Sequence, residues 1–155
     1  KVPKKQAMSQ PVQPTKAQFL AVTLNSDLQA TLTLFEQAGN WQERYRQIML
    51  LGKTLPRLDD DLRVDSAQVR GCESNAWLYH CEIDGQHYFV ADSDARIVKG
   101  LVALLLIACN GKSSAEITAF DPDSYFGQLG LQGQLSPSRT NGLLALAKAI
   151  KLAAQ

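Results

Sequence analysis

Apolar residues recur with helical spacing in the N-terminal third of the chain. Leu28, Leu32 and Phe35 repeat every three to four residues, which predicts one helix. Ser26 or Asp27 is suited to cap its start, and the Gly-Asn pair that follows it is suited to end it.

The next stretch, 41–55, has apolar side chains on one side and charged or amide side chains on the other. This pattern predicts an amphipathic helix that ends before Pro56. Residues 57–68 are predicted to be a polar connection with at most one helical turn. The acidic run Asp59–Asp61 is interpreted as a solvated helix start rather than a cation site. The apolar side of the helix is formed by Trp41, Tyr45, Ile48, Met49 and Leu51 or Leu55.

Two runs rich in residues that favour strands flank Asp84-Gly85 in the middle of the chain. That dipeptide favours a two-residue type I′ turn, so the stretch predicts a β-hairpin with Ile83 opposite Gln86. In this register one face of the hairpin is interpreted as the core face, and His80 and His87 are expected on the opposite, exposed face. The expected core face comprises Trp77, Tyr79, Cys81, Tyr88 and Val90.

The C-terminal half is predicted to be helical. Residues 97–109 are apolar on almost every side, which predicts a central buried helix, with Asp92 or Ser93 as its cap. Shorter helices are expected around 113–119 and 123–129. A last helix, with Ser136 as cap and Pro137 at its first position, is expected to bury Leu143, Leu146, Ala147 and Ile150. The order of elements predicts an α+β fold in a single domain, a small antiparallel sheet flanked by helices.

The composition narrows the class of protein. A chain of 155 residues with 45% hydrophobic residues is the size of one domain, and a net charge of +1 gives no reason to expect nucleic-acid or membrane binding. The longest apolar run, 100–109, is about half the length of a transmembrane helix. The first residues do not have the pattern of a signal peptide. Three cysteines without framework spacing fit a reducing, cytoplasmic environment.

The N-terminal segment is expected to differ from the rest. Residues 1–14 are rich in Pro, Lys and Gln and are predicted to be disordered, which leaves 15–155 as the folded domain. Met8 is interpreted as a candidate native start, with 1–7 as an added segment.

The stretch VRGCESNAWL (69–78) places Cys72 in a polar loop rather than in an apolar run. Cys72, His80, Cys81 and His87 resemble a zinc-ligand set by residue type, but they lack the usual spacing, and alternation puts His80 and Cys81 on opposite faces. A Cys–His nucleophile would need a base and an orienting group that the stretch does not supply. A thiol that accepts sulfur needs only a reachable thiolate, which Arg70 would favour. From the residues alone, a functional thiol and an inert loop thiol both remain open.

Four motifs in the same order resemble the SufE family of sulfur-acceptor proteins, nearest its CsdE branch. They are "WQERYRQIMLLGKTLPRLDDDLR", "VRGCESNAWL", "FVADSDARIVKGLVALLL" and "LSPSRTNGLLAL". The resemblance implies a SufE-like domain, similar to Fe–S scaffold proteins. It also implies a partner, a pyridoxal-phosphate-dependent cysteine desulfurase of the SufS or CsdA type.

In that family a cysteine takes the terminal sulfur of the desulfurase persulfide, stimulates the desulfurase and passes the sulfur on. The resemblance assigns this role to Cys72. It implies no cofactor or metal of the protein's own, and a downstream acceptor such as an Fe–S scaffold or a tRNA-modification protein. Whether such a carrier counts as an enzyme is partly convention. The alternative is a binding module that activates the desulfurase without carrying sulfur.

The other motif positions follow from the same resemblance. Gly71 would let the loop bend, and Trp77 would anchor its base. Arg139 matches an arginine near the cysteine loop, where it either favours the thiolate or pairs with a carboxylate. Glu73 replaces a glutamine common in SufE proper, and its charge would disfavour the thiolate. We therefore expect a loop that is quiet until the partner rearranges it. Cys81 and Cys109 are expected only to pack.

Overall fold

The computed structural model describes residues 13–22 and 28–155. The expected caps Ser26 and Asp27 lie outside the described residues, as does nearly all of the segment predicted to be disordered. The elements in chain order are α2 (Lys16–Leu20), α3 (Leu28–Gln37), α4 (Trp41–Gly52), η1 (Asp60–Leu62), η2 (Asp65–Ala67), β1 (Ala76–Ile83), β2 (Gln86–Ser93), α5 (Arg96–Cys109), β3 (Lys112–Ser113), α6 (Ser114–Ala119), α7 (Pro122–Gln128) and α8 (Pro137–Ala153).

The hairpin forms in the predicted register. Asp84 and Gly85 both have positive φ, at 52° and 80°, as a type I′ turn requires, and Ile83 pairs with Gln86. In the described part of the chain, the sheet is antiparallel with the order β1-β2-β3. The two-residue strand β3 was not predicted, because so short a strand has no alternation to detect.

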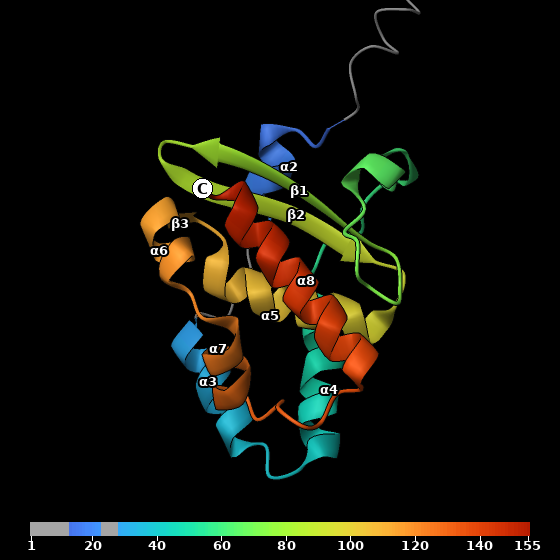
Figure 1. Cartoon of the computed structure of the whole chain (residues 1–155), viewed down its shortest axis with the longest axis vertical. Coiled ribbons are helices and arrows are strands. Elements are labelled where there is room, and N and C mark those ends of the chain that lie inside the picture. Colours follow the sequence, from blue (N-terminus) through green and yellow to red (C-terminus); the bar gives the residue numbers. More distant parts are fainter. Residues whose placement is uncertain (1–12, 23–27) are drawn as a thin grey trace, which may run out of the picture.

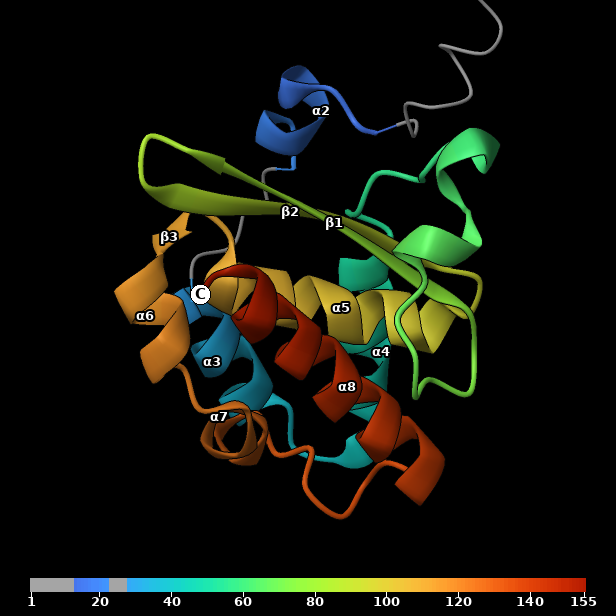
Figure 2. The same cartoon turned by 45° about the horizontal axis from the view of Figure 1, so that its top comes forward.

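The expectation about the faces of the hairpin was wrong. Trp77 and Val90 are buried on the predicted core face, but the opposite face is buried more completely, with Phe89 at 0% exposure and His87 at 2%. The reason is that helices cover both faces. The segment containing η1 and η2, together with α2, lies over one face, and α5 lies beneath the other (Figure 2).

Helix α5 is the centre of the molecule, as its apolar sequence predicted. It contacts β2, α4 and α8 (Figure 1), and its buried residues include Leu104 and Leu105 at 0% exposure. It approaches α4 so closely that a side chain at Gly100 would overlap the backbone of Ile48. Its N-cap is Ala95, so the predicted cap at Asp92 or Ser93 was wrong, because both residues belong to β2.

The last helix, α8, begins where the sequence predicted. Ser136 caps α8 by accepting a hydrogen bond from the Arg139 N–H, and Pro137 is its first residue. The predicted apolar face of α8 is buried, and this face packs toward α5 (Figure 1). The outcome is the predicted α+β fold, a single domain in which α8 runs alongside the loop that leads into β1.

Candidate functional site

The cysteine-containing loop spans residues 70–75 and is closed at its base by the backbone. The Val69 N–H donates to the Ala76 carbonyl oxygen at 2.8 Å, and Gln68 forms an isolated antiparallel bridge with Trp77. The loop is therefore a short excursion between two paired points, with Cys72 in its middle.

Gly71 has the backbone conformation that the loop needs. Its φ is +94°, a region that residues with a side chain rarely adopt, and a Cβ there would lie 3.2 Å from the Ala145 Cβ of α8. Glycine at position 71 thus fits the bend of the loop, while its expected part in bringing backbone close to the thiol stays a prediction.

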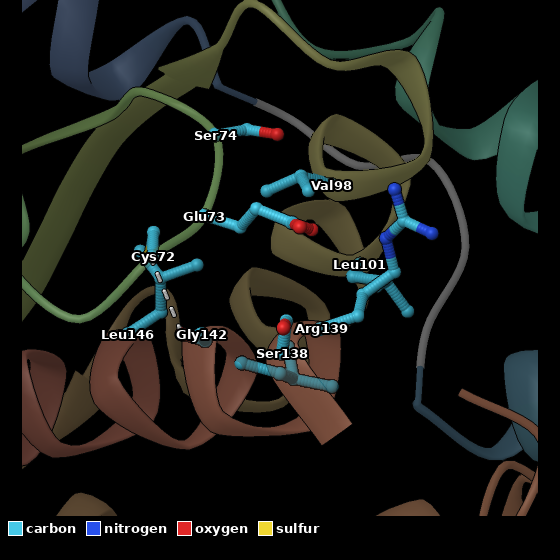
Figure 3. Close-up of a pocket in the computed structure, with 10 residues that line it drawn as sticks. Cys72, Glu73, Ser74, Val98, Leu101, Ser138, Arg139, Gly142 and Leu146 are labelled. Atoms are coloured by element: carbon cyan, nitrogen blue, oxygen red, sulfur yellow. Dashed lines mark hydrogen bonds between the residues drawn. The ribbon is translucent and has the colours of Figure 1, made fainter. Parts of the chain in front are cut away.

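The Cys72 thiol points toward α8 rather than into solvent. Its Sγ donates to the carbonyl oxygen of Gly142 at 3.5 Å (Figure 3). The thiol is half-buried, and this burial raises its pKa above the ordinary value. The resting thiol is thus mostly protonated at neutral pH. Burial is the cause of the raised pKa of Cys72, and neither the thiolate-favouring effect expected from Arg70 nor the effect expected from Glu73 contributes to it.

A cavity of about 10 Å³ lies beside Cys72, between the loop, α5 and α8. That volume holds roughly one water-sized sphere. The wall is apolar on the helix side, while Glu73, Ser74, Ser138 and Arg139 add polar atoms (Figure 3). The apolar lining residues are Val98, Leu101, Leu143 and Leu146.

Arg139 reaches the same cavity as Cys72 from the first turn of α8, as the resemblance implied. Among the described residues, no carboxylate forms an ion pair with its guanidinium, so the alternative of a simple paired helix-start residue is not observed. In this state the guanidinium points away from Cys72, with the Glu73 side chain between the two (Figure 3).

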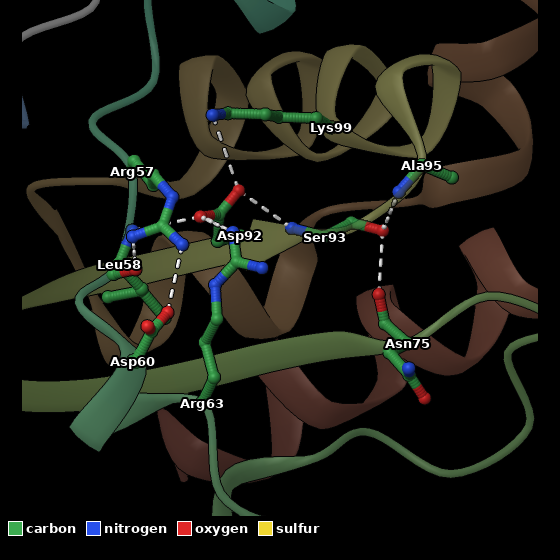
Figure 4. A network of polar contacts seen from close by, with 9 residues as sticks. All are labelled: Arg57, Leu58, Asp60, Arg63, Asn75, Asp92, Ser93, Ala95 and Lys99. Carbon is green, nitrogen blue, oxygen red and sulfur yellow. Dashed lines mark hydrogen bonds and ion pairs between the residues drawn. The ribbon is translucent and has the colours of Figure 1, made fainter.

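A polar network holds the C-terminal end of the loop (Figure 4). The Ser93 hydroxyl donates to the Asn75 carbonyl oxygen at 2.7 Å, and the Asp94 N–H donates to the same oxygen at 3.2 Å. The Asn75 side chain donates to Asp94 and accepts from Gln68 at 2.6 Å. Asn75 thereby fixes the point where the loop becomes β1.

Asp92 is the second anchor, and it was interpreted only as a possible helix cap. Its carboxylate is fully buried and accepts hydrogen bonds from Arg63 at 2.9 Å and from the Leu58 N–H at 2.8 Å, with Lys99 at 3.3 Å (Figure 4). Arg63 also lies over the Trp77 ring, 4.8 Å from its centroid. The predicted anchoring role of Trp77 therefore includes a cation–π contact. Arg63 and Asp92 are 29 residues apart, so the sequence around Asp92 gives no local sign of this pair.

The remaining cysteines do not join Cys72. Cys109 is fully buried in the core, and burial raises the pKa of its thiol to about 12, while Cys81 is half-buried against the core. Both therefore pack, as expected.

The histidines are not surface residues. His87 is 2% exposed, and its ring lies 2.7 Å from both the His80 Nε2 and the Ser114 Oγ. Sequence alternation correctly separated them from Cys81 but could not show which face α5 would cover.

Two negative findings concern residues 13–22 and 28–155. No group of three or more His, Cys, Asp or Glu side chains in this part of the chain could hold a metal ion. In the same part, no helix has the length and apolar character that crossing a membrane requires.

Comparison with known proteins identifies relatives over most of the chain. The SufE family, described as an Fe-S metabolism associated domain, matches residues 29–154. The sulfur acceptor protein CsdE of Escherichia coli is 45% identical over 117 residues, 75% of this chain and 80% of that protein. An uncharacterized SufE-like protein of Rhizobium etli is 41% identical over 116 residues, 72% of this chain and 78% of that protein.

A solved structure shares the fold. The solution structure of a hypothetical protein from Thermus thermophilus aligns with a TM-score of 0.67 at 20% identity, covering 82% of this chain and 92% of that one. With the sequence match over residues 29–154, these findings show that the chain belongs to the SufE family and is similar to CsdE.

Proposed function

We propose that this protein is a sulfur acceptor that takes sulfane sulfur from a cysteine desulfurase onto Cys72. The observation that carries the proposal is the position of Cys72, on a glycine-containing loop beside a small cavity and an unpaired arginine, in a chain 45% identical to a sulfur acceptor. Cys109 is fully buried in the core and Cys81 lies within strand β1 rather than on a loop, so both are poorer candidates.

Transfer of the sulfur atom to Cys72 needs no cofactor on this chain, because one S–S bond forms as another breaks. The Cys72 thiolate attacks the terminal sulfur of the desulfurase persulfide, and a new S–S bond forms on Cys72. The S–S bond of the donor breaks, and its cysteine leaves as a thiolate. Cys72 then carries the persulfide, and no net oxidation or reduction takes place.

The residues around Cys72 fit a regulated acceptor. Burial keeps the resting thiol protonated, so the donor protein has to expose the loop before attack. Arg139 lines the same cavity, and its cation would stabilise the anionic persulfide once the loop moves and the side chain turns toward it. The persulfide sulfur would then pass to Fe–S cluster assembly or to another sulfur acceptor, with the desulfurase freed for another turnover.

The test uses a cysteine desulfurase, cysteine with radiolabelled sulfur, and this protein on a non-reducing gel. Label should move onto the chain, be released by a reductant, disappear in Cys72→Ser and persist in the matched control Cys81→Ser. Label that persists in Cys72→Ser would overturn the assignment of the site. Faster desulfurase turnover without label on the chain would instead show a non-covalent activator.

A further inference from the structure

Gly142 is an unusual residue for its position in α8. It is buried in the interior of a helix, where glycine costs about 1 kcal/mol relative to alanine. Its φ is not in the left-handed region, so the backbone does not require glycine. The alanine-rich sequence around it shows that alanine is well tolerated elsewhere in this helix. The reason for a glycine must lie in what packs beside it.

Cys72 packs beside it. A Cβ on Gly142 would lie 3.4 Å from the Cys72 Cα, 3.5 Å from its Sγ and 3.7 Å from its Cβ. One methyl group would therefore be in ordinary van der Waals contact with these three atoms of Cys72. Any longer side chain would need space that the cavity of about 10 Å³ does not offer.

Gly71, the residue before Cys72, packs on the same face of α8, about one turn after Gly142. Ala145 lies three positions after Gly142, and a Cβ on Gly71 would approach its Cβ to 3.2 Å. Because Gly71, Gly142 and Ala145 are all small, the backbone of Gly71 and Cys72 can pack directly against α8.

Little else holds the tip of the loop there. In the part of the chain that the structure describes, the hydrogen bond from Cys72 Sγ to the Gly142 carbonyl oxygen is the one that joins residues 70–74 to α8. A thiol is a weak donor, so this bond contributes little. Close packing on α8 therefore holds the loop tip, and position 142 is where a larger side chain would meet Cys72 itself.

We propose that Gly142 is a positioning residue whose missing side chain forms the seat for the retracted Cys72, so that the size of residue 142 sets how often the loop leaves α8. The inference rests on the proposed function, because it gives the seated loop a role as the resting state of a sulfur acceptor. A seated thiol is shielded and protonated, whereas a released one is free to attack.

The test measures the alkylation rate of Cys72 against pH, with the label located by peptide mass spectrometry. The variants are Gly142→Ala, Gly142→Val and Gly142→Leu. The matched control is Asn141→Leu, which places the same side chain on the exposed neighbouring position of α8. Thermal unfolding of each variant verifies the fold, and the Cys81 label in the same sample is the internal reference.

Release of the loop should lower the apparent pKa of Cys72 in the Leu variant, because the thiol leaves its buried position, and its reaction at neutral pH should become about tenfold faster. Val should be intermediate and Ala smallest, while Asn141→Leu should match the wild type. Equal pH profiles in wild type and the folded Val or Leu variant would overturn the inference. If neither larger variant folds, the Ala variant decides, with a rise of about twofold expected and an unchanged rate contradicting it.

Failure of this inference is distinguishable from failure of the proposed function. Sulfur transfer to the wild-type protein is measured in parallel with the desulfurase. Unchanged alkylation with normal transfer removes the role of Gly142 alone. Faster alkylation of the variants without any transfer to wild type keeps the seat and removes the sulfur-acceptor function.

Discussion

The guanidinium of Arg63 lies 2.9 Å from the carboxylate of Asp92, whose side chain has no exposed surface. Arg63 also covers Trp77, which follows the cysteine loop directly, and Lys99 brings α5 to the same carboxylate. One buried charge therefore connects the segment before the loop, the second strand of the hairpin and the central helix.

Asp92→Asn should destabilise the protein strongly. The amide would leave Arg63 and Lys99 without their partner, and removal of one member of a buried ion pair costs about 3 kcal/mol. Urea unfolding measures the loss. Asp60→Asn is the matched control, because the Arg57–Asp60 pair is exposed and its loss should have no measurable effect. Equal midpoints for both variants would contradict the role of Asp92 as an anchor.

Gly71→Ala should loosen the loop rather than unfold the domain. Alanine at φ +94° is strained by about 1–2 kcal/mol, and its Cβ would press on Ala145. The loop can relieve both by leaving α8, so Cys72 alkylation should accelerate while the unfolding midpoint falls only slightly. Gly39→Ala is the control, since a Cβ there meets nothing within 4 Å and φ is not positive. Slower alkylation in Gly71→Ala would contradict this account.

Local rules predicted much of the fold. The Asp84-Gly85 turn predicted the register of the hairpin, because two residues with positive φ determine which positions pair. The apolar run of α5 predicted its central position. Ser136 and Pro137 predicted the start of α8, because capping is a contact between near neighbours.

Long-range packing accounts for what the sequence could not predict. Alternation separates the faces of a hairpin but does not say which face a distant helix covers, and so the burial of His87 was missed. Asp92 was interpreted as a cap because its partners Leu58, Arg63 and Lys99 come from other elements. The loop around Cys72 left its role open until the family resemblance assigned it, and its contact with Gly142 spans 70 residues and needs the fold.

The stability of the protein should fall in alkaline solution because of Cys109. Burial raises the pKa of this thiol from 9.0 to about 12, so the unfolded chain loses its proton first as the pH rises. The folded state then binds more protons, and stability falls by about 1.4 kcal/mol per pH unit between these two values. Urea unfolding at pH 8 to 11 should show this slope. Cys109→Ala should be less stable at pH 8 but should show a shallower decline, and parallel slopes would exclude Cys109 as the cause.

Acid should destabilise the protein through His80. Burial and the neighbouring His87 lower the pKa of His80 below 6.5, so the folded state resists protonation. Its contribution to stability is present above pH 6.5 and is lost as the pH falls through the lowered pKa. The unfolding midpoint should drop between pH 7 and 5 in wild type. Because the chain has only two histidines, His80→Gln is a clean comparison, and the drop should be smaller in that variant. An equal drop would assign the effect to other groups.

Arg139 should matter for sulfur transfer and not for folding. It lines the cavity beside Cys72 and, among the described residues, has no carboxylate partner, so its removal breaks no ion pair. A persulfide is an anion at neutral pH, and a nearby guanidinium stabilises it by charge-assisted contact. Arg139→Gln should therefore slow transfer of radiolabelled sulfur to Cys72 by about tenfold, equivalent to about 1.4 kcal/mol, with an unchanged unfolding midpoint.

Arg46→Gln on the exposed side of α4 is the matched control, and its transfer rate should equal that of wild type. Arg139→Lys should recover part of the rate, because the positive charge is kept while the planar fork is lost. Equal transfer rates for Arg139→Gln and Arg46→Gln would show that the cation beside the thiol takes no part in the reaction.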